Sequence, residues 1–286
     1  MPKGATKYIV GGSMVLLGII LMVIAVCIGG TNVFNIFRGG LYINSSGIHI
    51  GGYDDLTNTE DSIVDINSIK NLKVDFDYGE MIIRSGNVDE VKIETRNIVQ
   101  DRLKCGVNGD TLEIKYDRSW NIVFFSFTSS DARIEITVPE TISFEKAEIR
   151  NGAGRMTVAD INVDELIIEN GAGEMVMNNV TATDELNIDG GVGAITVTDT
   201  VCGSIDADLG IGEFRFTGEI NGNGKMDSGV GAVYMTLYGD RNDYDFRVDS
   251  GIGQVTTPGS NSGAKYIFDV SSGIGEVKIT MEPKEG

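Results

Sequence analysis

Seven copies of a Gly-x-Gly motif, in which x is Ala, Val or Ile, occupy the C-terminal half of the chain. Successive first glycines are 19, 20, 19, 19, 22 and 22 residues apart. A period of this length is typical of repeat proteins, in which each repeat packs mainly on its neighbours. The glycine pairs are Gly152 and Gly154, Gly171 and Gly173, Gly191 and Gly193, Gly210 and Gly212, Gly229 and Gly231, Gly251 and Gly253, and Gly273 and Gly275.

The residues that flank each motif repeat a second pattern. With the first glycine as position zero, positions −5, −3, +1, +4 and +6 are nearly always apolar; in the second copy they are Leu166, Ile168, Ala172, Met175 and Met177. Positions −5 and −3 share one face of a strand, as do +4 and +6, whereas +1 and +4 differ in parity. Each repeat is therefore predicted to be a strand, a glycine corner, a strand and a polar turn. We expect four or five of the apolar side chains to be buried in inward-facing columns.

Two all-β architectures fit this unit, a parallel β-solenoid and a β-sandwich of stacked hairpins. Hairpins favour Asn-Gly turns, but only Asn151 and Asn170 precede the first glycine of a motif. Solenoid coils instead stack like residues about 4.8 Å apart, which matches the apolar columns. The pattern favours the solenoid (β-helix), with the sandwich as the alternative.

The N-terminal region predicts a membrane anchor. Residues 8–30 carry no charge and are long enough to span a bilayer as a transmembrane helix. Lys3 and Lys7 precede this segment, so residues 1–7 are expected in the cytoplasm and the rest outside the cell membrane. A cleaved signal peptide or a lipoprotein signal at Cys27 is the alternative. Residues 31–68 read as a juxtamembrane linker with one short strand.

The remaining chain, residues 69–286, is predicted to be an extracytoplasmic β-repeat domain. Residues 69–145 hold irregular strands and a cap, and residues 146–281 hold the seven repeats. The formal charge of the chain is −19, although residues 1–40 contain only Lys3, Lys7 and Arg38 as charged groups. So acidic a domain repels nucleic acid, which we exclude as a partner, and attracts cations or basic partners.

The segment ARIEITVPE (132–140), followed by NGAGRMTV (151–158) and its successive copies, resembles the bacterial putative-adhesin family. This family consists of β-strand-repeat domains of unknown function, often behind one transmembrane helix. The resemblance covers residues 69–286. It implies a cell-envelope protein, in some cases near envelope-stress systems of Gram-positive bacteria, and it supplies no catalytic residues.

Catalytic motifs are not evident. The single histidine, His49, lies in the expected linker, so the repeats cannot form a Ser-His-Asp or Cys-His arrangement. The Gly-x-Gly copies lack the third glycine and following helix of a dinucleotide site. Paired carboxylates of a carbohydrate-active enzyme remain an alternative. We expect a protein that is not an enzyme and has no cofactor.

Acidic residues occupy position −2 in five consecutive repeats, and a solenoid would stack them in one column. They are interpreted either as a solvated surface or as calcium ligands, although calcium repeats place the acid after the glycines. The column comprises Glu169, Asp189, Asp208, Asp227 and Asp249, of which the four aspartates are the candidate metal ligands.

Three other features remain open. The aromatic side chains of Trp120, Phe124, Phe125 and Phe127 form either a contact patch or a cap over the N-terminal end of the stack. At the other end, Pro283 and its charged neighbours are expected to discourage strand addition. Cys105 and Cys202 either pair or sit as buried hydrophobic residues, and we favour burial.

These features favour a membrane-anchored binding, adhesin-like or scaffold module whose partner is an envelope protein or a glycan. The alternative is an accessory component of an envelope-stress sensing system that acts through a membrane partner. A carbohydrate-active enzyme is the third hypothesis.

Overall fold

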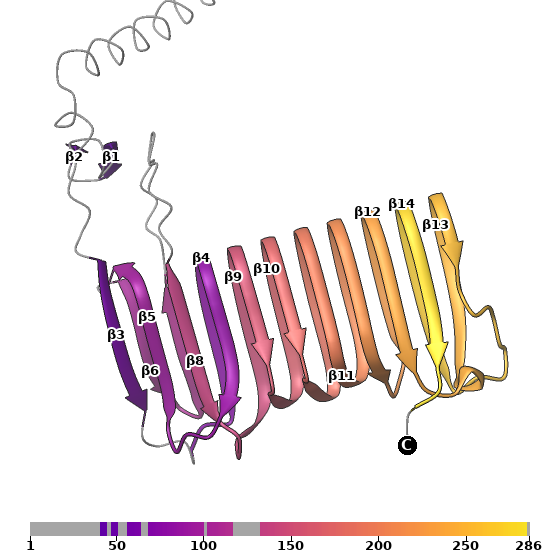
Figure 1. The fold of residues 1–286 in the computed structure, drawn as a ribbon, viewed down its shortest axis with the longest axis horizontal. Coiled ribbons are helices and arrows are strands. Elements are labelled where there is room, and N and C mark those ends of the chain that lie inside the picture. The colour runs from indigo at the N-terminus through magenta and orange to yellow at the C-terminus, as the bar shows by residue number, and fades with distance from the viewer. Residues whose placement is uncertain are drawn as a thin grey trace, which may run out of the picture. The chain divides into compact units, whose positions relative to one another are not determined.

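The computed structural model describes residues 41–44, 47–50, 56–63, 68–99, 102–116 and 132–284, and nearly all of them are in β-strands (Figure 1). The chain divides into two units. In the first unit the described residues form one antiparallel hairpin, β1 (Leu41–Asn44) with β2 (Gly47–Ile50). The second unit contains the other described strands and all the repeats.

Four strands that are consecutive in the chain form the centre of the second unit, with each parallel to the next. They are β9 (Ser143–Ala159), β10 (Asn162–Asn178), β11 (Thr181–Ile220) and β12 (Gly224–Tyr238), and β11 carries two repeats. Equivalent glycines lie side by side: Gly154 beside Gly173, for example, and Gly212 beside Gly231. The predicted parallel solenoid is confirmed. Consecutive repeats of a hairpin sandwich would pair antiparallel, so that alternative is wrong.

The two glycines of a motif are needed for different reasons. The second has a positive φ, +149° at Gly212, where a Cβ atom would lie 1.7 Å from the carbonyl oxygen of Gly193 in the preceding coil. The first glycine of that motif, Gly210, lacks the positive φ, but its Cβ would lie 2.3 Å from the carbonyl oxygen of Gly191. The backbones of neighbouring corners are therefore in direct contact, which any side chain would prevent.

The core contains four of the five predicted apolar columns. Positions −5, −3, +4 and +6 are buried, as with Leu166, Ile168, Met175 and Met177 of β10. A further buried column comes from the turns between coils, where Ile161, Val180, Cys202 and Ile220 are at most 2% exposed. Position +1 was expected to face inward as well. This expectation is wrong, because the bend at the glycines turns that side chain out to the solvent.

The N-terminal end of the solenoid contains an additional coil that lacks a Gly-x-Gly motif. Strand β4 (Asn71–Gly86) runs parallel to β9 and places Gly79, with φ +122°, beside Gly154. Beyond β4, β7 (Thr111–Tyr116) pairs with its first half and β8 (Arg133–Pro139) with its second half. The end is then closed by antiparallel strands: β6 (Leu103–Asn108) on β7, β5 (Val91–Val99) on β8, and β3 (Leu56–Ile63) on β5.

Strand β3 belongs to the segment that was expected to be a linker. The described part of residues 31–68 also contains the β1–β2 hairpin, so it holds three strands where one was expected. Its composition gave no sustained apolar period, and the pairing of β3 with β5 is a long-range contact that such a short segment does not encode locally.

The C-terminal end departs from chain order. Strand β14 (Tyr266–Glu282) pairs with β12 on one side and β13 (Tyr244–Thr256) on the other, so the last repeat lies between the fifth and the sixth (Figure 1). The short 3₁₀ turn η2 (Arg241–Asp243) leads the chain past this position, and residues 257–265 bring it back. These connections account for the longer spacing of the last two motifs.

Two predicted features lie outside the described residues. They are the membrane segment 8–30 and the aromatic group Trp120, Phe124, Phe125 and Phe127. In the part of the chain that is described, no helix has the length and apolar character needed to cross a bilayer.

The contact between corners predicts a sharp difference between two glycine-to-alanine substitutions. Gly212→Ala places a methyl group against a backbone carbonyl at a positive φ, so we expect a loss of about 3 kcal/mol or more in the free energy of unfolding. Gly106→Ala in β6 has open space around the new Cβ and should change stability little. Urea denaturation of the full chain measures both. Equal effects of the two substitutions would contradict this account of the corner.

Candidate functional site

The glycine corners form a long edge of the solenoid, and the side chain at the middle of each motif points outward from it. We call these residues the apolar ridge. Its larger members are 44–73% exposed, and the full ridge consists of Ala153, Ala172, Val192, Ile211, Val230, Ile274 and Ile252 in spatial order. Glycines lie on both sides of every member, so no neighbouring side chain covers the ridge.

A groove follows the ridge on the side of the first strand of each repeat. One stretch of about 310 Å³ is lined by Asp75, Asp77, Arg150 and Glu169 among others, and the next, of about 750 Å³, by Asp208, Asp227 and Asp249. Asp189 and Gly191 line both stretches, which therefore adjoin. We call the two together the acidic groove. Its floor consists of corner residues, mainly glycine and serine together with Asn151, Asn170 and Leu209, and its outer wall is the predicted column of carboxylates.

The carboxylate column is interrupted by the exchange of the last two repeats. Ser271 of β14 lies beside Asp227 of β12, and Asp249 of β13 lies beside Ser271. Asp227 and Asp249 are therefore separated by a serine, contrary to the expected stack of five consecutive acids. The column could be inferred only by assuming that the repeats stack in chain order, and this assumption fails at β14.

Two of the five column members have basic partners. The carboxylate of Glu169 lies 2.8 Å from the guanidinium of Arg150, and that of Asp227 lies 2.8 Å from the Lys225 ammonium. The Lys225 hydrogen bond, with smaller help from Ser271, lowers the pKa of Asp227. Asp189, Asp208 and Asp249 form no ion pair with any residue that the structure describes. The groove thus keeps uncompensated negative charge along its wall.

The spacing of the carboxylate column bears on its predicted role as a set of calcium ligands. Among the described residues, no group of three or more His, Cys, Asp or Glu side chains is close enough together to hold a metal ion. Each coil contributes one carboxylate to the column, at the spacing of about 4.8 Å between strands, whereas calcium binds six to eight oxygen ligands at 2.3–2.6 Å.

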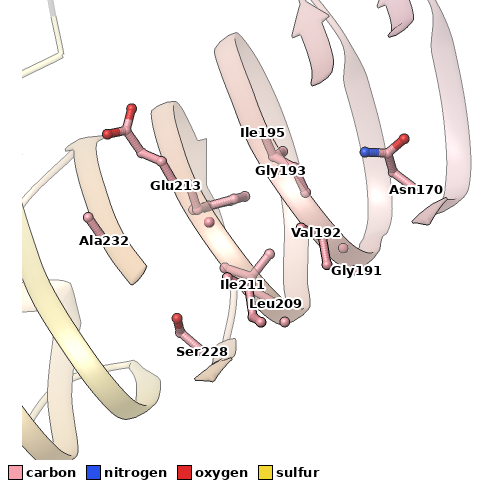
Figure 2. Close-up of a pocket in the computed structure, with 14 residues that line it drawn as sticks. Asn170, Gly191, Val192, Gly193, Ile195, Leu209, Ile211, Glu213, Ser228 and Ala232 are labelled. Carbon is pink, nitrogen blue, oxygen red and sulfur yellow. The ribbon is translucent and has the colours of Figure 1, made fainter. Parts of the chain in front are cut away.

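A small cavity of about 20 Å³ lies at the corners and is lined by residues from Asn170 to Ala232, among them Val192 and Ile211 (Figure 2). It is about the size needed for one water molecule. Next to it, the Asn151 side-chain amide donates to Asn170 Oδ1 at 3.2 Å, and both asparagines are buried. The cavity is too small for a ligand, so the acidic groove and the apolar ridge are the candidate site.

Sequence reasoning missed the part of the groove formed by β4. Asp75 and Asp77 line it, and Tyr78 lies beside Ala153 at the start of the ridge. The signal was present, because Leu72, Val74, Met81 and Ile83 stand at the same offsets from Asp77-Tyr78-Gly79 as the apolar positions around a Gly-x-Gly motif. This copy was missed because Asp77 stands where the motif has its first glycine, so a search for Gly-x-Gly does not find it.

The two cysteines of the second unit do not pair with each other. Cys202 is buried in the turn column, and burial raises the pKa of its thiol to about 12. It is therefore protonated at neutral pH and unsuited to nucleophilic chemistry. Cys105 is exposed on β6, contrary to the expected burial.

Comparison with known families bears on the fold. The family model described as Toastrack DUF4097 matches residues 61–286. The chain belongs to this family. The predicted resemblance is confirmed. A comparison with curated proteins gives no match.

Solved structures that match most of this chain are distant from it in sequence. The chain is 15% identical to a protein described as a putative adhesin from Bacteroides fragilis, with 80% of this chain and 100% of that one covered and a TM-score of 0.45. It is 15% identical to a putative cell adhesion protein from Clostridium sporogenes, with the same coverage and a TM-score of 0.40. For a putative lipid binding protein from Parabacteroides distasonis the values are 13% identity, 82% and 96% coverage, and 0.43.

The column geometry predicts how the protein responds to calcium. With one carboxylate per coil, we expect millimolar calcium to change the melting temperature of the full chain no more than magnesium at the same ionic strength, because only non-specific screening remains. A specific site would add stabilisation that grows with calcium concentration. A calcium-specific rise that disappears in the Asp189→Asn, Asp208→Asn double variant would contradict this expectation.

Proposed function

We propose that the chain is a non-catalytic, adhesin-like binding module of the bacterial cell envelope, anchored in the cell membrane through residues 8–30. Its binding surface is the corner edge, and its ligand is an extended segment of an envelope protein that carries both basic and apolar side chains. The observation that carries this proposal is the apolar ridge lying beside the acidic groove across consecutive coils.

The shape of the surface favours an extended chain. From Val192 to Ile252 the ridge crosses five neighbouring coils. At about 4.8 Å per coil this distance is roughly 19 Å, the length of about six residues of extended polypeptide. The glycine floor lets a ligand approach the backbone closely, and alternating side chains of the ligand would meet the ridge on one side and the carboxylates on the other.

The charge of the surface favours a cationic ligand. Asp189, Asp208 and Asp249 lack basic partners among the described residues, and the chain as a whole is strongly acidic. Anionic polymers and anionic lipid headgroups are repelled by such a surface. Sugar rings commonly stack on aromatic side chains, and none lines the described groove. These features support a protein segment over a glycan.

A defined peptide tests the proposal. We expect a ten-residue peptide of alternating lysine and valine to bind the full chain in zwitterionic lipid nanodiscs, and the same peptide with glutamate in place of lysine not to bind. Each exposed ion pair contributes about 0.2–1 kcal/mol, so the Asp189→Asn, Asp208→Asn, Asp249→Asn variant should bind the lysine peptide roughly tenfold more weakly. Fluorescence anisotropy measures the dissociation constants.

The matched control neutralises three exposed acids outside the groove: Asp89→Asn, Glu94→Gln and Glu113→Gln. It removes the same charge, so it separates a local effect from the general field of an acidic protein. Equal weakening in both variants, or equal binding of the glutamate peptide, would refute the groove as the binding surface. Replacing Ile211 and Val230 of the ridge by serine should weaken binding of the lysine peptide independently of salt.

A further inference from the structure

The exchange of the last two repeats leaves β13 as the outermost strand of the solenoid (Figure 1). Among the described strands it pairs only with β14, so every second peptide group of β13 faces away from the sheet. The expected protection by Pro283 and its charged neighbours does not apply to this edge. Those residues follow β14, an interior strand, and Lys284 forms an ion pair with Glu219 at 2.8 Å.

The end of the stack is covered only in part. Beside the first residues of β13, the guanidinium of Arg241 lies over the ring of Phe246, 5.5 Å from the centroid. The same guanidinium donates to the carbonyls of Tyr244 and Pro258. Phe246 is accordingly buried. The half nearer the corner has no such cover among the described residues.

Comparison of β13 with β14 shows what is left open. In β14 the inward positions Val270, Ser272 and Val277 are buried, whereas the equivalent Val248 and Val255 of β13 are half-buried and Ser250 is exposed. An unpaired edge with apolar side chains beside it is a site for strand addition.

We infer that a second copy of this chain pairs with β13, antiparallel, about a two-fold axis that lies midway between the two copies of Val248. An isologous contact of this kind closes on itself and gives a dimer, without the open-ended growth of a head-to-tail stack. In an antiparallel pair, directly opposed residues lie on the same face of the sheet. The core-facing side chains of both copies therefore share one face only if a residue of β13 lies opposite its own equivalent across the axis.

Charge complementarity selects Val248 as that residue. In this register Arg247 of each copy lies opposite Asp249 of the other copy. Two outward-facing ion pairs therefore form, each between a guanidinium and a carboxylate. Both side chains are exposed in the single chain, where Arg247 reaches Asp245 at 3.0 Å. A register centred on Ser250 would set Asp249 opposite Gly251 and lose both pairs. A register centred on Phe246 would set Arg247 opposite Asp245, but Ser260 and Asn261 already donate to Asp245, and Arg241 covers Phe246.

The same register fits the connection that returns from β13 to β14. Ser260 and the backbone N–H of Asn261 both donate to the Asp245 carboxylate at 2.8 Å, which holds this loop beside the strand. Asp245 lies opposite Gly251 of the second copy, a position without a side chain. No partner side chain therefore meets the loop at this position, and Val248 lies opposite its own equivalent at the open end of the core.

Disulfide cross-linking of the full chain tests the register. In a background with Cys27→Ser and Cys105→Ser, which retains the buried Cys202, we expect Val248→Cys to form a covalent dimer with its own equivalent under mild oxidation in membranes. The Arg247→Cys and Asp249→Cys chains should cross-link when the two are co-expressed, and each far less alone, because like positions lie beyond the disulfide range of about 7 Å.

Lys225→Cys is the matched control, since it occupies the position of Arg247 in the interior coil β12 and is equally exposed. Equal cross-linking of Lys225→Cys would mean random collision and would overturn the proposal. Absence of a Val248→Cys dimer would overturn it as well, and so would Arg247→Cys and Asp249→Cys chains that cross-link equally well alone and together.

Charge reversal supplies a second measurement. Arg247→Asp in the Val248→Cys chain should lower the dimer yield on the order of tenfold, and adding Asp249→Arg should restore it, because the reversed pair is again complementary. Thermal melting of each variant verifies that the fold is retained. Failure of the double variant to restore dimers in a folded chain would refute the paired register. Of the three unpaired groove carboxylates, this register engages only Asp249, so failure of the dimer leaves ligand binding at Asp189 and Asp208 untouched.

Discussion

Direct contact between glycine backbones at the corners is the constraint on which the rest of this structure depends. Carbonyl oxygens of one coil lie where the Cβ atoms of the next coil would be, at 1.7 Å for Gly212 and 2.3 Å for Gly210. The chain can therefore bend sharply in each repeat while neighbouring strands keep their hydrogen-bonding distance. Because the corners align, positions −5, −3, +4 and +6 also align and form one continuous core.

The same constraint creates the surface. A corner without side chains on either side of its middle residue leaves that residue exposed, and repetition turns single exposed residues into the apolar ridge. The bare backbone beside it becomes the floor of the acidic groove, below a wall of carboxylates at position −2. The edge that is most restricted in sequence by folding is thus also the edge that is open to a partner.

The ends of the solenoid meet a different requirement, because the outermost coil has no further coil to cover its core-facing side chains. At the N-terminal end, β5 and β6 run antiparallel to the coils that they pair with, and β3 pairs antiparallel with β5, which ends the run of consecutive parallel pairs. At the C-terminal end, β13 passes beyond the position that β14 then fills, and Arg241 covers Phe246 but leaves Val248 half-buried. The two ends are therefore unequal, and the second leaves the half-buried Val248 beside an unpaired edge of β13.

The sequence alone favoured the parallel solenoid over the hairpin sandwich, and it determined the role of glycine and four of the buried columns, because each follows from a local period that recurs in every repeat. It did not determine the exposure of position +1, since alternation in a straight strand gives the opposite answer and the bend at the two glycines reverses it. Nor did it determine that Ser271 interrupts the carboxylate column or that β13 is the edge. Those facts depend on the order in which the repeats are stacked. Two repeats with equivalent apolar positions can exchange places without any change in their own sequence pattern. Only the tertiary structure therefore decides between the two orders.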